Sequence, residues 1–387
     1  MTRRMILLVS GQPMANLLAA LEPSLGVGEV DLVVTGDMQA GGKGDRLVEV
    51  LEGRGLACRW HSVSDPYDPE ATRRPVAALL ARDSETTVVN LTGGTKPMAL
   101  GAHRAAVEAG VRDILYLVED GRFRWLEGQR PPFPVGASLS VAEVVRAHGF
   151  GVVGSVAPSP QRIATARALD PLLTGGTLHG WNRLMAAVEK TSRKRKLWTP
   201  ALVPLDAAIS SSPEALPLDR DALRRAVALG DDAGLCRLVG EGLVVGNSLC
   251  HAFLAGGWFE HLLFDVLTTR ASTLGLGDIR ANLEVEDAAG ARNEIDAAAM
   301  RGRSLLLFEC KTVRFGRDTG EKAANILYRL EHLRALGGLG TRALLVSRDP
   351  VEGKVRKAFE GEGIGLVDGV TGATLGERLA EALGRLS

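Results

Sequence analysis

The sequence predicts an α/β protein of two α/β domains joined by a mainly helical connector. Short apolar runs alternate with helical patterns in the first part of the chain, residues 1–135, and the same alternation returns in residues 246–387. The stretch between them, residues 136–245, is dominated by helical patterns and opens after the Pro-rich run 131–134. These observations predict three segments with boundaries near residues 135 and 245.

The first segment has the pattern of a doubly wound, mostly parallel sheet. Its apolar runs are separated by helices, of which the clearest begins near residue 14 and another spans 97–109. The expected strands cover residues 5–9, 30–35, 56–63, 86–91, 113–118 and, at one edge, 123–127. In such sheets a ligand binds beyond the carboxyl ends of the strands, so the turns that follow the strands are candidate binding loops.

Three of these turns are polar, and they follow the first, second and fourth expected strands. The third of them, residues 90–98, combines two glycines with two threonines, a lysine and a proline preset for the first turn of a helix. Backbone amides at such a helix start can bind a phosphate, although a tight strand–helix turn with a chance lysine explains the same residues. The candidate ligand-binding residues are Ser10, Gly11, Gln12, Asn16, Thr35, Thr92, Gly93, Gly94, Thr95, Lys96 and Met98.

The third turn matches neither of two common phosphate-binding motifs. It is not G-x-x-x-x-G-K-[ST], and no partner carboxylate of a nucleoside triphosphatase is evident. It is not G-x-G-x-x-G either. A standard nucleotide-binding loop is therefore not predicted.

The connector contains one predicted helix with a capping box, at residues 138–149, where Ser140 is followed three residues later by Glu143. Residues 151–162 are expected to form a loop, and 218–230 and 231–245 to be helical, which suggests a winged-helix-like module. The basic run 193–196 either grips phosphates or is a solvated surface loop.

Two strands in the last segment carry charged residues inside apolar surroundings. Asp296 lies on one strand, and Glu309 and Lys311 lie on the next. Because side chains alternate between the two faces of a strand, Glu309 and Lys311 are expected on the same face. A Glu and a Lys two residues apart usually form a solvated ion pair, but charges in buried strands are rare unless they are paired or bind a metal. Two carboxylates suit a hard divalent cation, and the lysine can orient or activate an attacking water.

The helical pattern at residues 256–267 supplies a third carboxylate. Glu260 lies on the flank of the apolar stripe, where it is either a boundary residue in an ion pair or a member of the site. After the two charged strands the chain alternates again. The expected elements are a helix at 319–336, a strand at 341–346, a helix at 351–360, a strand at 363–367 and a helix at 374–386.

Composition restricts the class of protein. The formal net charge is zero, so any nucleic-acid binding must come from a local patch of positive charge. The four cysteines, at positions 58, 236, 250 and 310, form no C-x-x-C pair, which argues against a zinc knuckle and for a reducing cytoplasm. No apolar run approaches the length of a membrane span, and the short run at the start does not have the form of a signal peptide.

Two segments resemble known families. The run N-L-T-G-G-T-K-P-M-A-L-G-A at residues 90–102, together with the turn that begins at Ser10, resembles the signature loops of CARF domains, which have a CRISPR-associated Rossmann fold. Asp296, Glu309 and Lys311 resemble the core of restriction-endonuclease-like PD-(D/E)xK nucleases, although Ile295 stands where that pattern has proline. That superfamily usually adds a helix carboxylate, and Glu260 is the matching position.

Together the two motifs resemble CRISPR ancillary nucleases that cyclic oligoadenylate activates. The resemblance implies a homodimer that binds one cyclic oligoadenylate across its two-fold axis and cuts DNA, and in some members RNA, with Mn²⁺ or Mg²⁺. It implies metal binding by Glu260, Asp296 and Glu309, catalysis by these three and Lys311, and it favours cyclic tetra-adenylate (cA4) over cyclic hexa-adenylate (cA6). Two alternatives stay open: a ligand-gated nucleic-acid-binding regulator that does not cleave, and a ring nuclease that degrades the activator.

Overall fold

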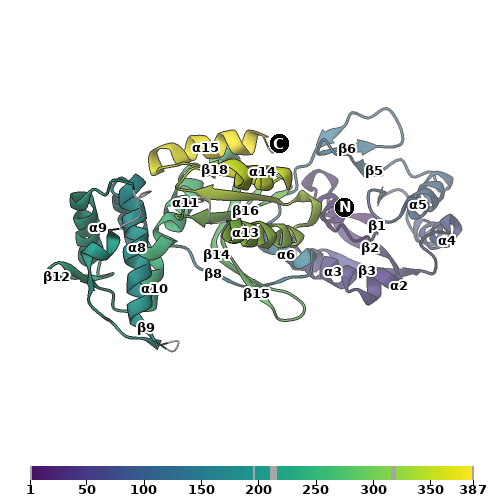
Figure 1. The fold of residues 1–387 in the computed structure, drawn as a ribbon. Coiled ribbons are helices and arrows are strands. Elements are labelled where there is room, and N and C mark those ends of the chain that lie inside the picture. The colour runs from purple at the N-terminus through teal and green to yellow at the C-terminus, as the bar shows by residue number, and fades with distance from the viewer. Residues whose placement is uncertain (1, 195–196, 210–215, 315–319, 386–387) are drawn as a thin grey trace.

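The computed structural model describes residues 2–194, 197–209, 216–314 and 320–385. Three units follow one another along the molecule: an N-terminal α/β domain, a C-terminal α/β domain in the middle, and a helical module at the other end (Figure 1). The predicted fold class, a Rossmann-like α/β domain and a second α/β domain, is confirmed. No helix in the described ranges is both long and apolar enough to cross a membrane.

The N-terminal domain is built on a seven-stranded sheet of order β3-β2-β1-β4-β5-β6-β7. The five strands from β3 to β5 are parallel, and β6 and β7 are antiparallel additions at one edge. The strands are β1 (Arg3–Leu8), β2 (Val27–Thr35), β3 (Ala57–Val63), β4 (Thr87–Asn90), β5 (Ile114–Leu117), β6 (Arg122–Trp125) and β7 (Phe133–Pro134). The strand expected at 123–127 is therefore next to the edge strand rather than the edge itself.

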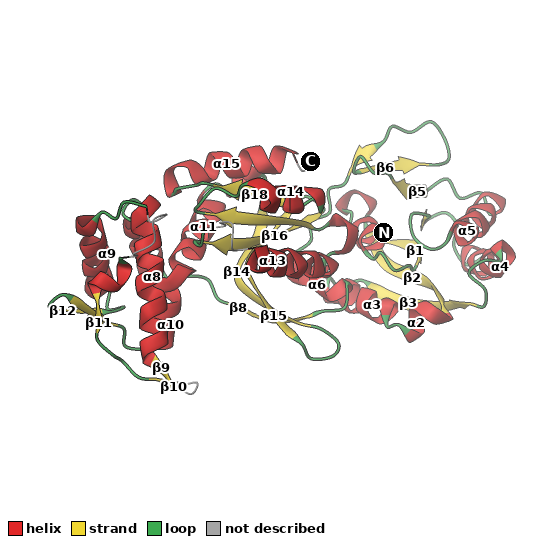
Figure 2. Ribbon diagram, in the orientation of Figure 1, coloured by secondary structure: helices red, strands yellow, loops and turns green. Residues whose placement is uncertain are grey.

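Helices cover both faces of this sheet (Figure 2). They are α1 (Met14–Ala20), η1 (Pro23–Leu25), α2 (Gly36–Ala40), α3 (Lys43–Gly53), α4 (Pro69–Leu80) and α5 (Lys96–Glu108). Alternate residues of β1 enter separate apolar clusters: Met5 and Leu7 pack with α1 and α3, and Ile6 and Leu8 with α4 and α5. This alternation is why the buried strands read as continuous apolar runs in the sequence.

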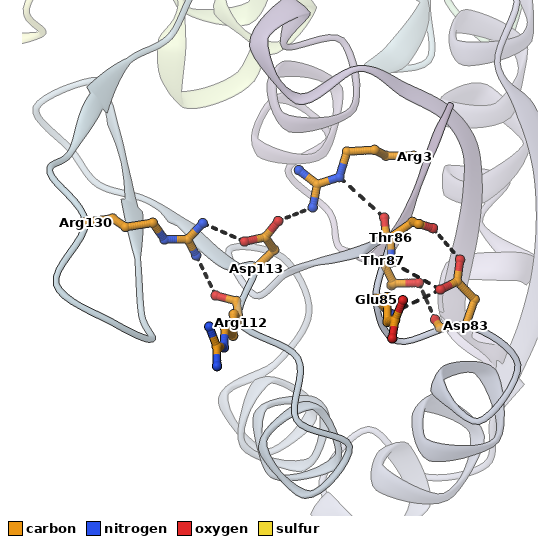
Figure 3. A network of polar contacts seen from close by, with 8 residues as sticks. All are labelled: Arg3, Asp83, Glu85, Thr86, Thr87, Arg112, Asp113 and Arg130. Atoms are coloured by element: carbon orange, nitrogen blue, oxygen red, sulfur yellow. Dashed lines mark hydrogen bonds and ion pairs between the residues drawn. The ribbon is translucent and has the colours of Figure 1, made fainter. Parts of the chain in front are cut away.

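The amino-terminal edge of the same sheet is held by a polar network (Figure 3). Asp113 accepts hydrogen bonds from Arg3 and from Arg130, the latter at 2.5 Å, and Arg3 also donates to the carbonyl of Thr86 at 3.4 Å. Asp83 receives the amides of Glu85 and Thr86, each at 3.1 Å. The network ties the starts of β1, β4 and β5 together and leaves the opposite, carboxyl-terminal edge for the polar turns.

The C-terminal domain contains a six-stranded sheet of order β18-β17-β16-β15-β14-β8. Its strands are β8 (Gly151–Ser155), β14 (Gly277–Glu286), β15 (Arg292–Arg301), β16 (Ser304–Lys311), β17 (Arg342–Ser347) and β18 (Gly365–Asp368). The loop predicted at 151–162 is wrong for most of its length, because β8 and the first turn of helix α7 (Pro160–Leu169) leave only 156–159 without regular structure. Glycine at 151 and 154 weakens the strand pattern, and pairing with β14 supplies what local propensity lacks.

The helices of this domain lie on both faces of the sheet. They are α6 (Val141–Ala147), α7, α10 (Ser248–Ala252), the π-helical turn η3 (Phe253–Gly257), α11 (Trp258–Thr269), α12 (Ala271–Leu274), α13 (Gly320–Leu333), η4 (Arg334–Leu336), η5 (Gly338–Gly340), α14 (Gly353–Gly361) and α15 (Gly372–Arg385). The capping box of α6 is present, because Ser140 and Glu143 exchange hydrogen bonds. Residues 319 and 386, at the ends of two predicted helices, lie outside the described residues.

The helical module is formed by α8 (Gly175–Ser192), β9 (Arg193–Lys194), β10 (Leu197–Trp198), β11 (Val203–Pro204), η2 (Leu205–Ala208), α9 (Arg220–Asp232), β12 (Arg237–Val239) and β13 (Gly242–Val244). Strands β11, β13 and β12 form a small sheet beside α8 and α9, and the winged-helix-like character of the module stays a prediction. The helix predicted at 231–245 is wrong, since β12 and β13 form a hairpin there. Arg195 and Lys196 of the basic run lie outside the described residues.

This module does not lie between the two α/β domains. The chain first adds β8 and α7 to the C-terminal domain, and only then forms the module, on the side of that domain that faces away from the N-terminal domain (Figure 1). The two α/β domains instead meet directly. One apolar cluster contains Leu7 of β1, Val144 and Val145 of α6, and Leu305 and Leu307 of β16, so a continuous core joins the two sheets through α6.

Candidate active site and ligand site

The candidate catalytic residues of β15 and β16 are brought together by the pairing of these strands. Antiparallel pairing joins Ala297 to Phe308, and just beyond this pair the Asp296 carboxylate accepts a hydrogen bond from the Cys310 amide at 2.6 Å. The carboxylate of Asp296 thus replaces part of the backbone ladder where the two strands diverge. Glu309 is 1% exposed. Its carboxylate is contacted by Lys311 and Arg329.

Two cations hold one oxygen of the Glu309 carboxylate. Oε1 accepts hydrogen bonds from Lys311 Nζ at 2.6 Å and from Arg329 Nη1 at 2.8 Å. The other oxygen, Oε2, is buried and has no hydrogen-bond partner among the described residues. A buried carboxylate oxygen without a donor is costly, and it can be satisfied by a cation that approaches from its free side.

Glu260 comes from the first turn of α11, and it belongs to the same electrostatic cluster. Burial, followed by the negative charge of Asp296, raises the pKa of Glu260 to about 8. Burial, followed by the charge of Glu309, raises the pKa of Asp296 to about 6. Burial alone would lower the pKa of Lys311, but Glu309 and Asp296 hold it above its usual value, so the lysine is charged.

The donor set fits a hard divalent cation. Three carboxylates belong to one electrostatic cluster, and burial together with the repulsion between their charges raises the pKa values of two of them. Among the described residues no group of three His, Cys, Asp or Glu side chains is already placed to hold an ion. The side chains would therefore have to draw together around a metal, with Glu309 Oε2 as the free ligand atom.

Arg329 is the member of this site that sequence reasoning did not select. Lys322, Asn325 and Arg329 are spaced three and four residues apart on the helix after β16, a pattern that fits residues facing either the substrate or solvent. In the structure Lys322 and Asn325 are exposed, while Arg329 reaches Glu309 and the backbone carbonyl of Glu294. No local signal separates the three residues, because only the packing of α13 decides which of them turns inward.

The raised pKa values predict how the stability of the metal-free protein depends on pH. An acid whose pKa is raised by folding stabilises the fold fully below its ordinary pKa, and this contribution is lost as pH rises through the raised value. For Glu260 the loss falls between the ordinary 4.5 and about 8. We expect Glu260→Gln to unfold at a less pH-dependent temperature than the parent protein over this range, measured by calorimetry with a chelator present. Equal pH dependence in both proteins would contradict the burial of an uncompensated Glu260.

The candidate ligand loops lie side by side at the carboxyl-terminal edge of the N-terminal sheet. They follow β1, β2 and β4, and these strands are neighbours in the order β2-β1-β4. The predicted residues are thus brought to one edge, as a doubly wound sheet requires. Their side chains, however, divide into two groups.

The first group is turned inward and shapes the loops. Asn16 is fully buried and donates to the carbonyl of Leu8 at 2.8 Å, and Asn90 donates to Asn16 Oδ1 at 3.2 Å. Thr92 donates to Asn90 Oδ1 at 2.7 Å and accepts from the Leu117 amide at 2.8 Å. Asn90, which was not among the candidate ligand residues, is therefore the centre that orients this loop.

Four further candidates also have structural partners. Thr35 and Thr95 cap the helices α2 and α5 through the amides of Met38 and Met98. Met98 is 1% exposed and packs in the apolar cluster with Leu8. The added Cβ of a residue at Gly93 would stand 2.1 Å from the Leu8 carbonyl oxygen, so the need for glycine there comes from close approach to β1.

The second group remains open to a ligand. Gly11, Gln12 and Lys96 are exposed, and Ser10 is partly buried, with its hydroxyl accepting from the Gln12 amide at 3.3 Å. Lys96 is the first residue of α5, a helix of 13 residues, so its charge stands at the positive end of the helix dipole. The carboxyl-terminal edge of the sheet therefore presents exposed hydrogen-bond donors and a positive charge, held by the strands and helices beneath them.

Comparison with known families identifies both domains. Residues 5–143 match the model described as the Card1 CARF domain, and residues 249–366 match the model described as the Card1-like endonuclease domain. No curated protein matches the sequence significantly.

Solved structures with low sequence identity share the fold. Protein VC1899 from Vibrio cholerae is 19% identical with a TM-score of 0.77, and the match covers 99% of this chain and 97% of that one. Can2 from Sulfobacillus thermosulfidooxidans, solved in complex with cyclic tetra-adenylate, is 18% identical with a TM-score of 0.76, covering 98% of this chain and 97% of that one.

A third structure, described as a type III CRISPR defence DNA nuclease activated by cyclic oligoadenylate, is 19% identical with a TM-score of 0.58. The match covers all of this chain (100%) but only 52% of that one. The chain thus belongs to the proteins that join a CARF domain of the Card1 type to a Card1-like endonuclease domain.

Proposed function

We propose that this protein is a metal-dependent endonuclease of type III CRISPR defence that cyclic oligoadenylate activates. The observation that carries the proposal is the cluster of Glu260, Asp296 and Lys311 around the buried Glu309, in an endonuclease domain that packs directly on a CARF domain. The structures of cA4-bound Can2 and of the cyclic-oligoadenylate-activated DNA nuclease support the same activator class and a DNA substrate.

In this proposal Glu260, Asp296 and Glu309 would hold Mn²⁺ or Mg²⁺. When bound, such an ion polarises the scissile phosphate and lowers the pKa of a coordinated water. Asp296 is kept in place by the Cys310 amide, and Glu309 by its two cations. Lys311, charged and within hydrogen-bond reach of Glu309, would orient the attacking water and offset negative charge on the phosphate.

The activator would bind at the edge formed by the loops after β1, β2 and β4. Lys96, at the positive end of the α5 dipole, would contact a phosphate, and Gln12 would contact the ring. A cyclic oligoadenylate is itself symmetric, so two chains can read it with the same loops, which favours a homodimer with one ligand across its axis.

Supercoiled plasmid DNA provides the direct test. We expect nicking by the full-length protein only when cA4 and Mn²⁺ are both present, with cA6 and a linear tetra-adenylate as matched controls and single-stranded RNA as a second substrate. Binding of cA4 without any cleavage would support the ligand-gated regulator instead. Loss of cA4 from the mixture without nicking would support a ring nuclease.

A further inference from the structure

Arg329 on α13 bridges the two strands that carry the acidic residues. Its Nη1 donates to Glu309 Oε1 at 2.8 Å, on β16, and its Nη2 donates to the backbone carbonyl of Glu294, on β15. The planar guanidinium fixes both acceptors in one geometry, which a flexible ammonium does not do. Glu309 is buried, so this bridge determines how its carboxylate is oriented.

The helix that carries Arg329 is anchored against the N-terminal domain. Its last residue, Leu333, and Leu336 of the following turn η4 are buried in the apolar cluster that also contains Leu7 of β1 and Val144 of α6. The same cluster includes Leu305 and Leu307 of the catalytic strand β16. A shift of the N-terminal domain against this cluster therefore acts on α13 and β16 together.

The ligand loop itself touches the continuation of α13. A Cβ added at Gly338, in η5, would lie 2.8 Å from Gln12 Oε1 and 2.7 Å from His148 Nε2, so these two side chains crowd the same point of the backbone. Gly338 has φ +62°, a left-handed conformation that favours glycine. The contact joins the turn after β1 to the endonuclease domain without any intervening element.

His148 makes this contact sensitive to the position of the Gln12 side chain. Its Nδ1 lies 2.8 Å from the Val144 carbonyl oxygen, which can only accept, so Nδ1 carries a proton. In the neutral ring Nε2 is then an acceptor, and it is buried with no hydrogen-bond partner among the described residues. Burial lowers the pKa of His148, so the ring stays neutral and a movement of the Gln12 amide can satisfy or expose this atom.

We propose that Arg329 is a positioning residue for Glu309, and that residues 320–340 carry the state of the Gln12 loop to it. This inference rests on the proposed activator site, because Gln12 belongs to that site. A ligand shifts a conformational equilibrium only through contacts that differ between the two states. Gln12 provides such a contact, since a change in its position on binding the ring also changes its packing on Gly338 of η5, the turn that continues α13.

Hydrogen exchange on the metal-free, full-length protein tests the route without using catalysis. Addition of cA4 is expected to change the exchange of backbone amides in α13 and η5 by at least about threefold in rate. Gly338→Ala should bind cA4 but lose this change, because the added Cβ separates Gln12 from His148. Gly340→Ala is the matched control, since its Cβ would meet only the Arg303 carbonyl oxygen at 3.5 Å and its φ is ordinary.

Cleavage assays test the end point of the route. Arg329→Ala should lower the activated kcat by about tenfold to a hundredfold, with the KM for plasmid and the Kd for cA4 unchanged. Arg329→Lys should stay close to Arg329→Ala, because it restores the charge but not the two-point bridge. His332→Ala, exposed on the same helix, is the control and should cleave like the parent protein.

The outcomes separate this inference from the proposed function. Binding of cA4 and activated nicking by the parent protein, together with unchanged exchange in α13, would overturn the route while the proposed function stands. Full activity of Arg329→Lys would overturn the positioning role and leave only a charge effect. Absence of cA4 binding by the parent protein would overturn both.

Discussion

Glu309→Gln is expected to abolish metal-dependent DNA cleavage and to leave cA4 binding unchanged. The substitution keeps the size of the side chain but removes the charge that Lys311 and Arg329 share on Oε1, and the carboxylate oxygen Oε2 that stands ready for a cation. A loss of at least about 10²–10³-fold in rate is expected when a group that organises transition-state charge is removed. Plasmid nicking with saturating cA4 and Mn²⁺ measures it.

A matched control for this variant lies on the neighbouring strand. Glu294→Gln makes the same chemical change at an exposed position, and it preserves the backbone carbonyl that Arg329 uses. It should cleave within about twofold of the parent protein. Near-normal, metal-dependent nicking by Glu309→Gln would remove Glu309 from the catalytic site.

Lys96→Ala is expected to weaken cA4 binding by about tenfold to a hundredfold and to shift activation to correspondingly higher cA4 concentration. Lys96 is exposed at the start of α5, where loss of a charge-assisted contact to a phosphate accounts for an effect of this size. Calorimetry measures the Kd, and the same titration should give one ligand for two chains. Arg82→Ala, an exposed cation outside the ligand loops, is the control.

Gly93→Ala should have a still larger effect on the same measurement. Its methyl group would stand 2.1 Å from the Leu8 carbonyl oxygen, which is backbone and cannot move aside without displacing β1. The turn from residue 90 to 98 would then lose its shape, while the endonuclease domain keeps its own core. Unchanged cA4 affinity in both Lys96→Ala and Gly93→Ala would show that the activator binds elsewhere.

The sequence does not show which polar side chains of the loops contact a ligand and which stabilise the loops themselves. Asn16 and Thr92 have side chains that could contact a ligand. In the structure, however, Asn16 donates a hydrogen bond to β1, and Thr92 is hydrogen-bonded to Asn90 and to the Leu117 amide. A short polar side chain in a turn can serve the backbone as well as a ligand. Which of the two it serves depends on what lies opposite, and that is set by the neighbouring strands.

The sequence also does not predict where the helical module lies in the molecule. Residues 175–244 stand between the two domains in the chain, but they lie beyond the endonuclease domain in space (Figure 1). The reason is the pairing of β8 with β14, which joins residues more than a hundred positions apart. The hairpin β12–β13 likewise replaced a predicted helix, because it completes a small sheet with β11.

By itself the sequence determined the two α/β domains, the loops at the carboxyl-terminal edge of the first sheet, and the strand residues Asp296, Glu309 and Lys311. These follow from periodicity and from charge within apolar runs, which are local properties of the chain. Only the tertiary structure decided that Arg329 joins Glu309, and that Gln12 meets Gly338. The first contact depends on how α13 packs against the sheet, and the second joins elements that are more than three hundred residues apart in the chain.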